Sequence, residues 1–178
     1  MMRHLKAGAI GAVLLTGSLM AGTAFAGEQY VDTTGFAASG YDVVAYHGLT
    51  QAPVGQAQPA PVPGKASITA EYNGAKWAFA SEANRDAFVA DPEKYAPAYD
   101  GHCAYGIAQG GKVAANPALW RIIDGKLYLN ITRTVVGFWE SDIQGNLKQS
   151  EVNWASLEMK SSPGGAVPQF DASHAPVN

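Results

Sequence analysis

Two Asx-Gly dipeptides constrain the fold of this chain more than any other feature. They are Asn73-Gly74 and Asp124-Gly125, and each stands between two short runs rich in β-branched and aromatic residues. Such dipeptides are typical of type I′ turns, because both central residues of that turn need a positive φ. The flanking runs are 68–72, 76–80, 119–123 and 126–131. We therefore expect two tight antiparallel hairpins.

Helical segments are expected to follow each hairpin. Ser81 is a candidate N-cap for a helix up to Ala90, and Asp91-Pro92 has the cap and first-turn proline of a second, shorter helix. After the second hairpin, the pattern becomes helical beyond Thr132 or Thr134. Hairpins that alternate with helices over short sequence distances predict an α+β fold with small antiparallel sheets.

The end of this pattern is expected to divide into two helices. We expect an interruption at 144–146, the Gln-Gly-Asn segment, and a last helix from Leu147 to about Met159. That helix would place Val152, Trp154 and Leu157 near one apolar face. Aromatic residues at hairpin and helix positions are interpreted as core. They are Tyr72, Trp77, Phe79, Phe88, Tyr95, Trp120, Tyr128, Phe138, Trp139 and Trp154.

The first 26 residues have the pattern of a secretory signal peptide. A short basic start precedes an apolar run, and Ala24-Phe25-Ala26 provides a small-x-small cleavage site. We expect cleavage after Ala26, export to the periplasm, a single domain over 27–160 and a disordered tail over 161–178. Inside the domain, four prolines in 51–65 predict a surface loop.

The charge of the mature chain excludes some partners. Loss of Arg3 and Lys6 with the signal changes the formal net charge from −3 to −5. No block of Lys and Arg remains to bind nucleic acid or an anionic membrane. The partners that we expect, a metal ion or a periplasmic protein, are not among those that this charge excludes.

Several segments resemble the YHS domain-containing proteins, in particular a periplasmic branch that includes selenoprotein members. They are GYDVVAY, EYNGAKWAFASEANRDAFVADPEKYAP, GHCAYGIAQG, DGKLYLNI and a final tryptophan-bearing helix, which together extend from about Tyr41 to Trp154. The resemblance implies a core of the treble-clef type with an added C-terminal hairpin and helices. It also implies a relation to metal-handling domains.

The chain departs from the metal-handling pattern at the first hairpin. Those relatives have F-C-S-x-x-C, whereas this chain has Ala80 and Ala83 in place of the two thiolates. We expect no zinc or copper thiolate site there, and we expect the two alanines to face the interior or each other.

Cys103, the single cysteine, is the remaining candidate for chemistry. Where similar sequences have GGYCA, this chain has His102 before the cysteine, and where they have GYDxVAYF, this chain has His47 in place of the final phenylalanine. His102 and His47 are therefore candidate imidazole ligands beside the Cys103 thiol. Thiolate and imidazole ligands suit copper, and we expect a copper centre at Cys103, His102 and His47.

Two alternatives stay open for Cys103. It could carry out thiol redox chemistry with a pKa lowered by His102, or it could be a small buried hydrophobe in an interaction module without chemistry. No triad, nucleophile elbow, P-loop or dinucleotide motif is present, so the sequence favours a non-enzymatic protein.

Overall fold

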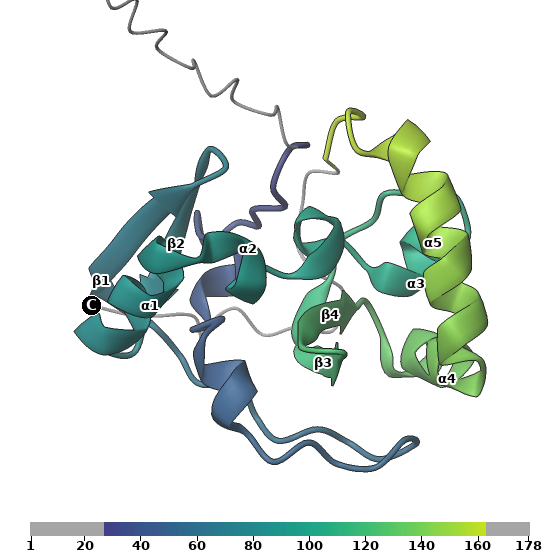
Figure 1. Ribbon diagram of the computed structural model, residues 1–178, viewed down its shortest axis with the longest axis horizontal. Helices are drawn as coiled ribbons and strands as arrows, with labels where there is room; N and C mark the ends of the chain where they lie inside the picture. The colour runs from purple at the N-terminus through teal and green to yellow at the C-terminus, as the bar shows by residue number, and fades with distance from the viewer. Residues whose placement is uncertain (1–26, 163–178) are drawn as a thin grey trace, which may run out of the picture.

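The computed structural model describes residues 27–162, and the fold is α+β as predicted. The first hairpin and α1 lie on one side of the molecule, α3, α4 and α5 lie on the other, and the second hairpin lies between them (Figure 1). The expected signal peptide and most of the expected tail lie outside the described residues. None of the helices in 27–162 has the length and hydropathy that a membrane-spanning segment needs.

The first hairpin forms at Asn73-Gly74, as predicted. Strand β1 (Lys65–Tyr72) pairs antiparallel with β2 (Ala75–Phe79), and the register is shifted between Lys65 and Thr69. Asn73 and Gly74 have φ values of 49° and 69°. These are the two positive values that a type I′ turn requires.

The second hairpin repeats this design. Strand β3 (Asn116–Ile123) pairs antiparallel with β4 (Lys126–Asn130) around Asp124-Gly125, whose φ values are 51° and 78°. An isolated parallel bridge joins Cys103 to Leu129 on β4. The second hairpin thereby holds the cysteine segment in place.

Side-chain caps start all five α-helices of residues 27–162, and three of these caps were predicted. Helix α1 (Glu82–Ala90) begins after Ser81, α2 (Pro92–Tyr95) after Asp91, and α4 (Arg133–Ser141) after Thr132, as predicted. Each cap accepts a hydrogen bond from the backbone N–H three residues later, which satisfies a donor that the helix itself leaves unpaired.

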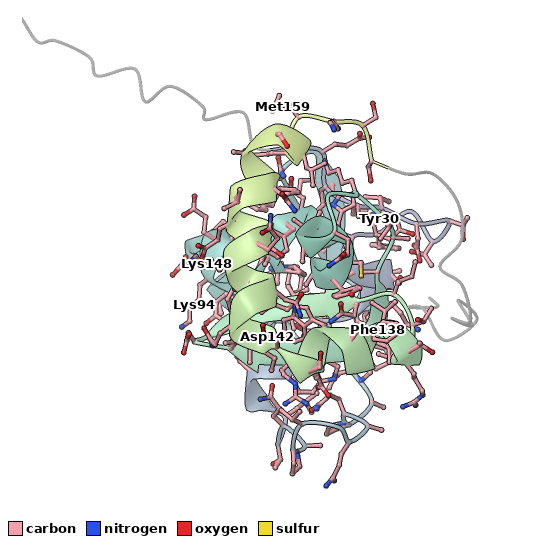
Figure 2. The ribbon with its side chains drawn as sticks, turned by 90° about the vertical axis from the view of Figure 1, so that its right-hand side faces the viewer. Tyr30, Lys94, Phe138, Asp142, Lys148 and Met159 are labelled. Atoms are coloured by element: carbon pink, nitrogen blue, oxygen red, sulfur yellow. The ribbon has the colours of Figure 1, made fainter. Side chains whose placement is uncertain are left out.

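The predicted boundary between the last two helices was wrong. Helix α5 (Ile143–Leu157) begins directly after Asp142 and continues through Gly145. The Gly145 N–H donates to Asp142 Oδ1 at 2.9 Å, so this glycine is part of the capped first turn and does not interrupt the helix. Figure 2 shows α5 along the outside of the molecule, from Asp142 at its start to Met159 beyond its end.

The proline-rich segment is a loop excursion that returns to its starting point. It leaves after the 3-10 helix η2 (Ala45–Gly48) and comes back to β1. At its return, the Gly64 N–H donates to Gly40 O, and the Asp42 N–H donates to Val62 O. We call residues 49–64 the excursion.

Most of the predicted aromatic core is confirmed, but not all of it. Trp77, Phe79, Phe88, Trp120 and Trp139 are buried. Tyr72, Tyr95, Tyr128 and Trp154 are only partly buried, and Phe138 is 55% exposed. On α5, Leu157 is buried but Val152 is 67% exposed, so the predicted apolar face does not include it. Aromatic rings that the core leaves partly exposed are candidates for binding.

Candidate functional site

The Gly-His-Cys segment lies between two short helical turns. It follows the 3-10 helix η3 (Ala98–Gly101) and precedes α3 (Ala104–Ala108), for which Cys103 is the N-cap. Tyr99, Asp100 and Gly101 have φ values of 57°, 52° and 76°. Two successive non-glycine residues in the left-handed region store backbone strain, which tends to collect at functional sites.

The Cys103 thiol is fully buried and takes part in capping. Its sulfur accepts the Gly106 N–H at 3.4 Å and lies 3.5 Å from Asn130 Oδ1, to which it donates. Burial raises the pKa of the Cys103 thiol, against the opposing effect of the nearby N–H groups of Gly106, Ile131 and Tyr105. A raised pKa keeps the thiol protonated at neutral pH, which is the opposite of what a reactive thiolate needs.

The His102 ring is fully buried, and both of its nitrogens have partners. Nδ1 lies 2.8 Å from Tyr99 O, and Nε2 lies 2.8 Å from Ser162 Oγ. Since a carbonyl oxygen only accepts, Nδ1 carries the proton and Nε2 accepts the Ser162 hydroxyl. Burial lowers the pKa of His102 to about 4, so the imidazole is neutral at pH 7.

His47 lies in η2, in a different environment. Its ring packs edge-on against Tyr95, with 5.3 Å between the ring centroids, and its buried Nε2 has no hydrogen-bond partner among the described residues. Burial lowers the pKa of His47, and the ammonium groups of Lys94 and Lys126 lower it further.

The three predicted copper ligands thus have separate surroundings. Cys103 contacts Asn130 and the start of α3, His102 contacts Tyr99 and Ser162, and His47 contacts Tyr95. Within residues 27–162, no three His, Cys, Asp or Glu side chains group closely enough to hold a metal ion. A copper centre at Cys103, His102 and His47 stays a prediction.

The corner between β2 and α1 is organised by a carboxylate. Asp42 is fully buried, and its Oδ2 accepts the Ala80 N–H at 2.8 Å and the Asn84 side-chain amide at 2.7 Å. Ala80 is partly buried and Ala83 is exposed, so the expectation that both alanines face the interior or each other was wrong for Ala83. The polar groups at this corner converge on Asp42.

A pocket that we did not predict lies where the first hairpin, α2 and η3 meet β4 and α5. It has a volume of about 450 Å³, within the range of roughly 300–1,000 Å³ typical of small-molecule sites. Its lining is Gln29, Tyr72, Asn73, Glu93, Ala96, Pro97, Ala98, Tyr99, Asp100, Lys126, Tyr128, Glu151 and Trp154. We call it the aromatic pocket.

Four aromatic side chains line the aromatic pocket. Tyr99 packs against Tyr128 and Trp154, with ring centroids 5.9 and 5.5 Å apart, and Tyr72 completes the set. The ammonium of Lys112 lies 5.4 Å from the centroid of the Trp154 ring. The face of an aromatic ring attracts cations, and Trp154 already has one such contact.

Carboxylates outnumber cations in this lining. Glu93, Asp100 and Glu151 face a single lysine, Lys126, whose Nζ donates to the carbonyl of Glu93 at 2.6 Å. Burial raises the pKa of Asp100, an effect that Lys112 opposes. Aromatic faces together with an excess of carboxylates produce a site that favours positive charge.

No single sequence signal marks this pocket. Its residues come from segments up to 125 positions apart, from Gln29 to Trp154. Tyr72, Tyr128 and Trp154 were interpreted as core. Tyr99 and Asp100 have successive positive φ values, but a tyrosine in that region has no sequence signature.

A second pocket, of about 220 Å³, lies between the excursion, β3 and α4. Arg133 and Glu140 contribute its charged groups. Glu140 is already paired with Arg121, so this pocket offers less free charge than the aromatic pocket.

Comparison with known proteins identifies one domain. The family model of the YHS domain matches residues 57–99, which include the first hairpin, α1 and α2. No curated protein and no solved structure matches the chain significantly. The matched segment ends at Tyr99, which lines the aromatic pocket, and the rest of the lining comes from Gln29 and from residues beyond the match.

Proposed function

Because the chain contains a YHS domain whose end forms one wall of a pocket, we propose that it is a secreted, non-enzymatic binding protein for a small organic cation. The observation that carries this proposal is the lining of the aromatic pocket, with four aromatic rings and three carboxylates against one lysine. The export signal predicted over residues 1–26 supports secretion.

The ligand class follows from the chemistry of the lining. A hard metal ion needs several oxygen ligands within about 2.6 Å, and the described residues contain no such cluster. An organic ammonium group needs an aromatic face within about 6 Å and a carboxylate nearby. Tyr99, Tyr128 and Glu151 offer this combination, and the pocket has room for the carbon skeleton of an amine.

Isothermal titration calorimetry with choline as the probe tests this proposal on the mature protein. Glu151→Gln should weaken choline binding several-fold through loss of a carboxylate, and Tyr128→Leu should weaken it about tenfold or more through loss of an aromatic face. Glu71→Gln, an exposed acid on β1, is the matched control and should leave the affinity unchanged.

Two outcomes would contradict the proposal. One is no heat of binding up to millimolar choline or butylammonium. The other is equal affinity in the Glu151→Gln, Tyr128→Leu and unmodified proteins, which would place the ligand elsewhere.

A second candidate function is copper binding through Cys103, with His102 and His47 as further ligands. The YHS match favours it, since this domain is associated with metal handling. For His102 Nε2 to bind a metal, its hydrogen bond with Ser162 must open, and the buried Cys103 thiol must lose its proton.

Competition for Cu(I) with a chromogenic chelator tests this candidate. Stoichiometric binding that is lost in both Cys103→Ser and His102→Ala would support a Cys-His copper centre, and His47→Ala would show whether a third ligand takes part. If Cu(I) is not retained, the copper candidate is wrong.

The redox alternative has its own test. The raised pKa of the Cys103 thiol predicts that a disulfide reagent reacts much more slowly with the folded protein than with the unfolded chain. Fast reaction in the folded state would favour thiol chemistry instead.

A further inference from the structure

Gly27 occupies a place that no larger residue can take. It is buried, and its carbonyl accepts the side-chain amide of Asn73 at 3.0 Å. A Cβ added to Gly27 would overlap Glu158 O and would lie 2.5 Å from Asp100 Oδ2. Both of these close neighbours are hydrogen-bond acceptors, and Gly27 directly follows the cleavage site predicted from the sequence.

Asp100 has an oxygen for which the described residues provide no donor. Its Oδ1 lies 3.4 Å from the Asn73 side-chain amide, whereas its buried Oδ2 has no hydrogen-bond partner within residues 27–162. An unpaired buried carboxylate oxygen is costly and therefore calls for an explanation.

We infer that Asp100 is the binding site for the new N-terminus that export creates, and that the Gly27 ammonium pairs with Asp100 Oδ2. Hydrolysis of the Ala26–Gly27 bond by a signal peptidase consumes one water and leaves a carboxylate on Ala26 and an ammonium on Gly27. The inference depends on cleavage at that bond; it uses one of the three carboxylates of the aromatic pocket and leaves Glu93 and Glu151 for the ligand of that pocket.

The geometry favours this pairing once the bond is cut. A free ammonium is no longer tied to Ala26, so rotation about the Cα–C bond of Gly27 can bring it to the place where a Cβ would stand. There its three N–H donors meet two acceptors, Asp100 Oδ2 and Glu158 O. An ammonium nitrogen can approach these oxygens to about 2.8 Å, closer than a methyl group can, so the pair forms after a rotation that stops short of the Cβ position.

The lysines near Asp100 donate their hydrogen bonds to backbone carbonyls, so the Asp100 carboxylate has no direct cationic partner among the described residues. Lys112, Lys126 and Glu158 act on Asp100, but the Lys112 Nζ donates to the carbonyls of Glu158 and Lys160, and the Lys126 Nζ donates to the carbonyl of Glu93. Burial raises the pKa of Asp100, as expected for a carboxylate without a direct cationic partner. The Gly27 ammonium would supply that partner.

The test compares the exported protein with a form whose ammonium is displaced by one residue. The full-length precursor is secreted, and its N-terminus is determined by mass spectrometry. The comparison protein has one serine inserted between Ala26 and Gly27. The pKa of the terminal amine is measured by NMR, and thermal stability is measured at pH 7.

We expect an exported protein that begins at Gly27. Its amine pKa should exceed the ordinary value of about 7.7–8.0 by about one unit or more, and its Tm should exceed that of the insertion protein. Both differences should disappear in Asp100→Asn, as a double-mutant cycle requires for a direct pair. The exposed neighbour Glu28 is the control, and Glu28→Gln should preserve both differences.

Four results would contradict the inference. An amine with an ordinary pKa, a Tm that the insertion does not change, or an effect that depends on Glu28 and not on Asp100 would show that the pair does not form. A mature N-terminus at another residue would do the same.

Discussion

At the scale of single residues, Asp42 organises the first half of the molecule. Its Oδ1 accepts hydrogen bonds from the backbone N–H groups of Val44 and Ala45. Its Oδ2 accepts hydrogen bonds from the backbone N–H of Ala80 and the side-chain amide of Asn84. One carboxylate therefore joins the N-terminal segment to β2 and α1. This corner contains no cysteine, and a hydrogen-bonded acid connects its elements.

We predict that Asp42→Ala destabilises the protein by about 3 kcal/mol or more, since three backbone donors and one amide lose their acceptor in a buried site. Urea denaturation followed by tryptophan fluorescence measures the loss. Asp86→Ala removes an exposed acid on α1 as the control and should change little. Equal midpoints for the two variants would mean that Asp42 does not hold the corner together.

His102 should make stability depend on pH. Its pKa is about 4 in the folded protein and about 6.5 in the unfolded chain, so the unfolded chain binds more protons between these values. Stability should therefore fall as pH decreases from 6.5 to 4, by on the order of 3 kcal/mol for this group.

The Tm measured from pH 7 to pH 4 tests this dependence. The decrease should be smaller in His102→Gln, and the remaining decrease will include His47, whose pKa is lowered as well. An identical pH profile for the variant and the unmodified protein would show that His102 is not buried as a neutral imidazole.

At the scale of elements, each of the two hairpin turns has a position that only glycine suits. Gly74 and Gly125 have φ values of 69° and 78°, and a Cβ on either would meet no atom within 4 Å. Any cost of substitution is therefore backbone strain and not steric overlap.

Gly125→Val should cost on the order of 1–3 kcal/mol, measured by chemical denaturation. Gly137 in α4 is the matched control, because a Cβ there also meets nothing within 4 Å but its backbone is helical. Gly137→Ala should maintain or increase stability. The opposite order of the two variants would refute the turn assignment.

These elements also show what the sequence can reveal. Hairpin turns and helix caps were predicted correctly because a few adjacent residues determine them, as at Asn73-Gly74 and Ser81. Gly145 was misjudged because a glycine in a capped first turn looks the same as one in a break. The aromatic pocket was missed because each of its residues has an ordinary local role, and only the tertiary fold brings Tyr72, Tyr99 and Trp154 together.

At the scale of the whole molecule, a buried ion pair fixes the excursion to the C-terminal half. Arg121 on β3 pairs with Glu140 on α4, and both side chains are at most 6% exposed. Arg121 also donates to the carbonyls of Ala52 and Pro53, and Glu140 accepts the Gly55 N–H at 2.7 Å. The pair thus joins three segments.

Arg121→Met should destabilise the protein by about 3–5 kcal/mol, because it leaves the Glu140 carboxylate buried and unpaired. It should also make the excursion a site of rapid limited proteolysis. Arg85→Met, which removes an exposed pair with Asp86, is the control and should have no measurable effect. Unchanged stability and an intact excursion in Arg121→Met would contradict this role.

The most direct test of the proposed function compares a cation with its uncharged isostere. The mature protein is titrated with choline and, separately, with 3,3-dimethyl-1-butanol, in which carbon replaces the ammonium nitrogen, and binding is followed by NMR at the indole N–H of Trp154. The proposal predicts that choline shifts this resonance in a saturable way and that the neutral alcohol binds at least about tenfold more weakly. Equal binding of the two, or binding of neither, would contradict an organic-cation site in the aromatic pocket.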